Sequence, residues 1–104
     1  MQQNYAFQPG AGPANTSDIA VTAASQTLTL NPSGGSDGGS VRIANIGSQT
    51  VFLAFGTSTA SLTTSMPILA GTVEMFSLGG GITTLSVIAA AAGSIIYATV
   101  GTGI

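Results

Sequence analysis

Short runs of alternating apolar and polar residues, separated by stretches rich in Gly, Ser and Thr, make up most of the chain. In VRIAN (41–45), Val41 and Ile43 fall on one face of a strand and Arg42 on the other, because successive side chains of a strand point to opposite faces. The next run, VFLAF (51–55), is apolar on both faces. Such a strand is typical of the centre of a sandwich, or of an outer face that meets another subunit.

The same pattern predicts about seven short strands in all. They cover residues 19–23, 27–30, 41–45, 51–55, 72–78, 82–88 and 94–100. The turn around Gly47 predicts that 41–45 and 51–55 pair as a hairpin, and a second hairpin is expected between 82–88 and 94–100. Closely spaced strands and Gly-rich turns indicate an all-β fold, a small antiparallel β-sandwich or barrel.

Residues 82–100 allow a rival interpretation, because they are uncharged over the length of a transmembrane helix. Several Ser and Thr residues and Gly93 interrupt this segment, and no basic residue flanks it. We therefore expect strands rather than a membrane span. An amyloid-like or silk-like polymer is also disfavoured, because the turn signals are irregular rather than repetitive.

The first 18 residues show neither helical nor strand periodicity and contain prolines that prevent regular structure. They also lack the basic and apolar regions of a secretory signal. We expect an extended N-terminal arm (1–18) followed by a single β domain (19–104). Tyr5 and Phe7 would fill pockets if the arm added a strand to a neighbouring sheet. A disordered tail is the alternative in the isolated protein.

Charge is the most unusual property of the composition. Charged residues make up 4% of the chain, the net charge is -2, and Arg42 is the sole basic residue, whereas ordinary soluble proteins are about 25% charged. A surface so poor in charge gives little protection from association, so we expect partners, including copies of the chain itself, to cover part of it. One Arg cannot neutralise enough phosphates to bind nucleic acid.

The inventory of reactive side chains argues against catalysis. The chain has no His and no Cys, and its one basic side chain is an Arg, so a nucleophilic Ser would lack a base. Imidazole and thiolate ligands for a metal are missing too, and the Gly-rich stretch 31–40 lacks the Lys of a phosphate-binding loop. The acids Asp18, Asp37 and Glu74 are far apart in the sequence and show no paired-carboxylate pattern. We predict no enzyme activity, no cofactor and no metal site.

Three stretches resemble small β-rich structural proteins of tailed-bacteriophage virions. They are VRIANIGSQTVFLAFGTS, MPILAGTVEMFSL and GSIIYATVGTGI, and they span about two-thirds of the chain, residues 41–104. The resemblance implies a capsid decoration, or cement, protein that is made in the host cytoplasm and binds the major capsid protein on the capsid surface. It implies no catalytic residue, and a trimer would suit a three-fold position on an icosahedral shell.

Two functions stay open on this basis. The first is decoration of a capsid, with Tyr5, Phe7 and Phe52 as the candidate interface residues. The second is a small binding or adaptor module of a phage tail or fibre, in contact with other virion proteins or a host glycan. A glycan site would need exposed aromatic side chains, and the apolar strand around Tyr97 predicts that this ring lies in the core instead.

Overall fold

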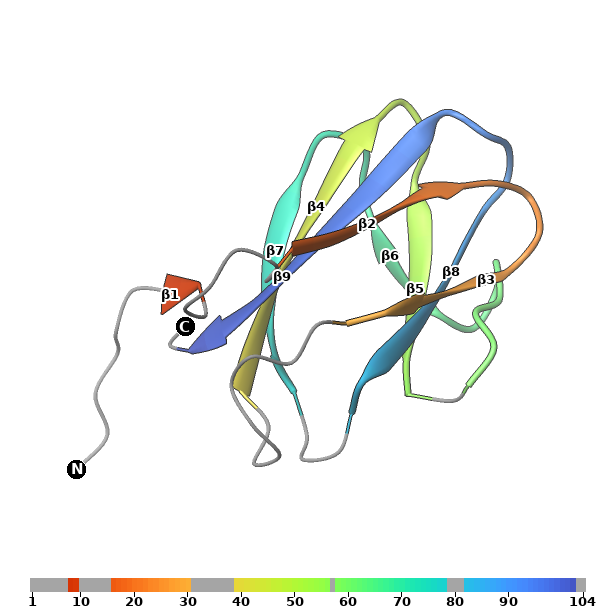
Figure 1. The fold of residues 1–104 in the computed structure, drawn as a ribbon. Coiled ribbons are helices and arrows are strands. Elements are labelled where there is room, and N and C mark those ends of the chain that lie inside the picture. Colours follow the sequence, from red (N-terminus) through yellow and green to blue (C-terminus); the bar gives the residue numbers. More distant parts are fainter. Residues whose placement is uncertain (1–7, 10–15, 31–38, 57, 79–81, 103–104) are drawn as a thin grey trace.

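The computed structural model describes residues 8–9, 16–30, 39–56, 58–78 and 82–102. Within these ranges the chain forms strands and no helix, and the strands make two antiparallel sheets (Figure 1). The strands are β1 (Gln8–Pro9), β2 (Thr16–Val21), β3 (Gln26–Thr29), β4 (Gly39–Gly47), β5 (Val51–Phe55), β6 (Met66–Ile68), β7 (Val73–Leu78), β8 (Thr84–Ala89) and β9 (Ser94–Thr102). The all-β prediction is confirmed, and the architecture is a sandwich rather than a barrel.

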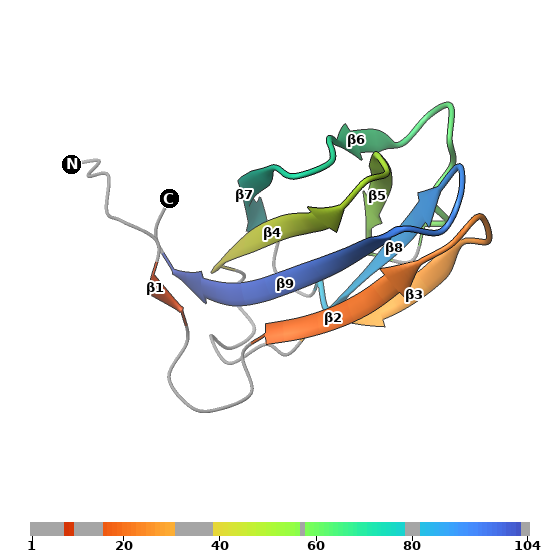
Figure 2. The same ribbon diagram turned by 90° about the horizontal axis from the view of Figure 1, so that it is seen from above.

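Sheet A contains β2, β9, β4 and β7 in that order, with β1 pairing the end of β9. Sheet B contains β3, β8, β5 and β6. From β2 onward, every connection except β5 to β6 carries the chain from one sheet to the other, as the two views show (Figure 1, Figure 2). Sheet A thus has five strands and sheet B four, and without the two-residue β1 the remaining eight strands interleave in the order of a jelly roll.

Both predicted hairpins are wrong. The strands β4 and β5 belong to different sheets, and so do β8 and β9. A turn signal marks where the chain reverses, but a reversal can either pair two strands or carry the chain across the sandwich. Crossing is favoured here because apolar residues on the inner faces of both strands then enter one core, which a single hairpin cannot enclose.

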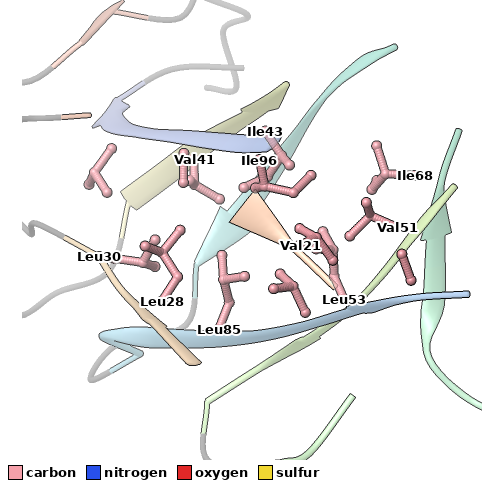
Figure 3. Close-up of a cluster of buried hydrophobic side chains, with 14 residues drawn as sticks. Val21, Leu28, Leu30, Val41, Ile43, Val51, Leu53, Ile68, Leu85 and Ile96 are labelled. Carbon is pink, nitrogen blue, oxygen red and sulfur yellow. The ribbon is translucent and has the colours of Figure 1, made fainter. Parts of the chain in front are cut away.

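The core lies between the sheets and is almost entirely aliphatic (Figure 3). Its members come from both sheets: Val21, Leu28, Leu30, Val41, Ile43, Val51, Leu53, Ile68, Leu85, Val87, Ala89, Ile96, Ala98 and Val100. Val41 and Ile43 face this core and Arg42 is exposed, as the alternation along 41–45 predicts. Phe55 and Phe76 pack against this core. Their rings also contact each other edge to face, with centroids 5.6 Å apart, and so join the two sheets.

Residues 82–100, the candidate membrane span of the sequence, contain β8 and most of β9. Their alternate side chains, such as Leu85, Val87 and Ile96, point into the core. None of the described segments is a helix that could cross a membrane. The apolar character of this region is explained by two strands that bury one face each.

Candidate interaction surface

The outer face of sheet A carries the side chains that alternate with the core positions. Tyr97 of β9 lies between Asp18 of β2 and Ala44 of β4, and Val73 of β7 extends this row. Because directly paired residues share a face, all of these side chains point away from the core. The row therefore brings four strands together on one surface.

Two further rows flank the first. Thr16, Thr99, Arg42 and Met75 form one of them, and the hydroxyl oxygens of Thr16 and Thr99 lie 2.8 Å apart in a hydrogen bond. Ala20, Ile95 and Ile46 form the other. We call the apolar members of this face, Ile46, Val73, Met75, Ile95 and Tyr97, the sheet A patch. Asp18 and Arg42 are the charged side chains beside it.

Three large apolar side chains of the sheet A patch are exposed, and Met75 and Ile95 are half-buried. Ile46 is 54% exposed, Val73 45% and Tyr97 39%. Isolated exposed apolar residues are ordinary, but a contiguous group marks a site of contact. The prediction that Tyr97 lies in the core is wrong, because Ile96 and Ala98 occupy the inward positions of β9 and alternation turns Tyr97 outward.

The outer face of sheet B is partly covered by the Ser/Thr-rich segment before β6. The Ala60 N–H donates a hydrogen bond of 2.9 Å to Ser86 Oγ, and both residues are buried. This contact holds the segment against β8. Phe52 also points outward on this face, where it is half-buried and pairs with Pro67 of β6 and Ile88 of β8.

Phe52→Lys is expected to lower the free energy of unfolding by only about 1–2 kcal/mol, because the lysine stem keeps part of the contact and its ammonium reaches water. Leu53→Lys is the matched control, since Leu53 is 2% exposed and faces the core. That change should prevent folding, because it buries an unpaired charge. Urea unfolding followed by circular dichroism measures both effects. Equal losses would show that Phe52 is a core residue rather than a surface residue.

The other two predicted interface residues, Tyr5 and Phe7, lie outside the described residues, so their role stays a prediction. Within the segment predicted as an arm, Gln8–Pro9 pair with Thr102 and Gly101 of β9. Thr16 to Asp18 form the first half of β2.

The described residues offer contact chemistry of a simple kind. Asp18 and Arg42 are exposed on the outer face of sheet A, and Glu74 is exposed on β7, where it pairs with Ile43 and so belongs to the opposite side of the sheet. In the part of the chain that the structure covers, no three His, Cys, Asp or Glu residues are grouped as metal ligands would be. The outer face of sheet A therefore presents apolar side chains, one cation (Arg42) and one anion (Asp18) to a partner.

Comparison with known proteins adds little to this picture. The sequence matches no protein-family model and no curated protein. Among solved structures, the coat protein dimer of Tobacco streak virus is similar over 90% of this chain and 91% of that chain, with 14% sequence identity and a TM-score of 0.36. A similarity at this level assigns neither a family nor a function.

Proposed function

We propose that this protein is a non-enzymatic structural component of a bacteriophage virion, which binds the outside of the capsid and stabilises the shell as a decoration protein. The observation that carries the proposal is a jelly-roll sandwich with large apolar side chains on the outer faces of both sheets, Tyr97 on one and Phe52 on the other. Jelly rolls occur among viral capsid domains, lectins and cupins, so the fold alone would not separate these functions.

The chemistry of the chain supports a role in contact rather than in reaction. A protein with one basic residue, three acidic residues and no His has few groups from which to build a tuned acid and base. It can, however, contact a repeating surface through apolar and backbone groups. The major capsid protein is the proposed partner, and the proposed contact comprises Phe52 with Tyr5 and Phe7 of the arm.

Stabilisation would follow from mass action. A protein that binds the assembled shell and not its separated subunits shifts the equilibrium toward the shell. Copies that contact two neighbouring capsid subunits would strengthen the joint between them, and a repeated lattice multiplies this effect over the whole particle.

Quantitative mass spectrometry of purified particles tests the proposal. We expect hundreds of copies per particle, and we expect the combined variant Tyr5→Ala, Phe7→Ala to lower that number while the β-sheet circular dichroism spectrum stays unchanged. Glu74→Ala, at an exposed position on β7 away from the outer face of sheet B, is the control and should leave the copy number unaltered. Absence of the protein from particles would refute the proposal.

A module of the phage tail or fibre is the second candidate, and the exposure of Tyr97 favours it. An exposed aromatic ring on a flat sheet face could stack on a sugar, as glycan sites require. The same measurement separates the two candidates, because a tail component would be present in a handful of copies. Tyr97→Ser should then abolish binding to host glycans.

A further inference from the structure

We infer that the outer face of sheet A is a two-fold contact between two copies of this chain. The inference goes beyond the proposed function, because it concerns a different face from the proposed capsid contact. Two opposite charges lie on this face. Asp18 pairs with Tyr97 on one side of β9, and Arg42, the sole basic residue, pairs with Thr99 on the other side. Both side chains are exposed.

A two-fold axis can satisfy both charges at once. In a contact between identical faces, the axis lies in the plane of the interface, and each residue meets the residue that the axis maps onto it. An axis perpendicular to the line from Asp18 to Arg42, through its midpoint, puts each Asp18 opposite Arg42 of the second copy. Two ion pairs form in this way, and the midpoint falls on β9 between Tyr97 and Thr99.

The same axis also matches the apolar residues. On a sheet lattice with strands about 4.8 Å apart and about 6.8 Å between alternate residues, it places Val73 opposite Ile95 of the second copy. It also brings the two Tyr97 rings together, and the two Ile46 side chains. The strands of the two copies then cross at roughly 70°, nearer to the orthogonal than to the aligned class of sheet packing. The same two-fold rotation thus pairs opposite charges with each other and apolar side chains with each other.

A second copy fits this face better than it fits the β7 edge of the sheet. Pairing β7 with β7 of another copy would extend sheet A, but it would bring the two Glu74 carboxylates onto the same seam. The outer face of sheet A instead presents one positive and one negative side chain, so the same face of a second copy can neutralise both. A strongly charged partner such as a nucleic acid would gain nothing from such a surface.

The size of the face sets the expected affinity. Four strands and three rows of outward residues cover about 400–500 Å² per copy. This is at the low end for specific interfaces, so we expect a reversible dimer with a Kd on the order of micromolar. Such a dimer would be sparse in dilute solution and populated at high protein concentration.

Charge reversal in the full-length chain tests the inference by sedimentation equilibrium. Asp18→Arg places two cations opposite each other, and Arg42→Asp places two anions, so each single variant should weaken dimerisation at least about tenfold. The double variant Asp18→Arg, Arg42→Asp restores opposite pairs with the original net charge and should recover the Kd to within about threefold. The control Glu74→Arg changes the net charge as Asp18→Arg does, but lies off the face and should leave the Kd unchanged.

Several outcomes would overturn the inference. These are a protein that stays monomeric at millimolar concentration, single variants that dimerise like the parent, or a double variant that remains as weak as the singles. A trimer that is insensitive to both reversals would place self-association on another surface. Far-UV circular dichroism should show intact β structure in every variant, since all three positions are exposed. Copy number on particles is measured separately, so a result against the proposed function is distinguishable from a result against the dimer.

Discussion

Gly47→Ala is expected to lower the free energy of unfolding by about 3–5 kcal/mol, a large share of the roughly 5–15 kcal/mol that stabilises a typical domain. Gly47 ends β4 with a φ of 144°, a conformation that side chains rarely adopt. A Cβ atom there would lie 2.2 Å from the carbonyl oxygen of Gly93 and 2.6 Å from the Cα atom of Ser94. Both obstacles are backbone, so relief would require the two crossovers between the sheets to separate.

Those crossovers are held together by hydrogen bonds that the separation would break. The Ser48 N–H donates to the Gly93 carbonyl at 3.2 Å, and the Gln49 N–H donates to Ser94 Oγ at 2.9 Å. Gly71→Ala is the control, because Gly71 has a positive φ of 74° but open space around the added Cβ. Gly71→Ala should lower the free energy of unfolding by only about 1 kcal/mol, the effect of holding a residue with a side chain at a positive φ. Similar losses for the two variants, measured by urea unfolding, would contradict the close contact at Gly47.

Asn45→Asp is expected to lower the free energy of unfolding by about 3–5 kcal/mol at pH 7. Asn45 is fully buried, and its Nδ2 donates hydrogen bonds to the carbonyl oxygens of Gln49 at 2.8 Å and Ile68 at 2.9 Å. These two bonds join β4 to the crossover that follows it and to β6 of the opposite sheet. A carboxylate would place a negative oxygen against two carbonyl oxygens in the core.

The loss should depend on pH with a definite sign. Burial and the two carbonyl oxygens would raise the pKa of the introduced Asp above its unfolded value of about 3.9. Between the unfolded and the folded pKa, the native state holds more protons, so stability falls as the pH rises. The variant should therefore be more stable at pH 4 than at pH 7, relative to the parent. Asn45→Ala removes the same donors without a charge, and its loss of about 2–3 kcal/mol should not vary with pH. A pH-independent Asn45→Asp would show that the side chain reaches water.

Local alternation decided which side chains of a strand share a face, and it showed the inward face where only one face is apolar. On β5, which is apolar on both faces, only the packing of the two sheets places Val51 and Leu53 inward and Phe52 outward. Val41 and Ile43 on β4 are buried and Arg42 is exposed, as their period-two spacing predicts. This rule holds because a strand's geometry is set by its own backbone. The prediction for Tyr97 is wrong because it rested on the apolar residues around the ring and not on alternation. Ile96 and Ala98 face the core, so the side chain between them must face outward.

The sequence by itself determined seven of the strand segments, the inward face of β4 and the absence of His, Cys and Lys, since each depends on residues that are close in the chain or on composition alone. It did not indicate β1 or β6. The tertiary structure decided which strands pair, and it did so against both predicted hairpins. Backbone hydrogen bonds are much alike for every pair of strands, so pairing is chosen by how much apolar surface the whole chain can enclose. That choice put Asp18, Arg42 and Tyr97, which are far apart in sequence, on one exposed face. No local pattern contains that juxtaposition, because it exists only once β2 and β4 lie on either side of β9.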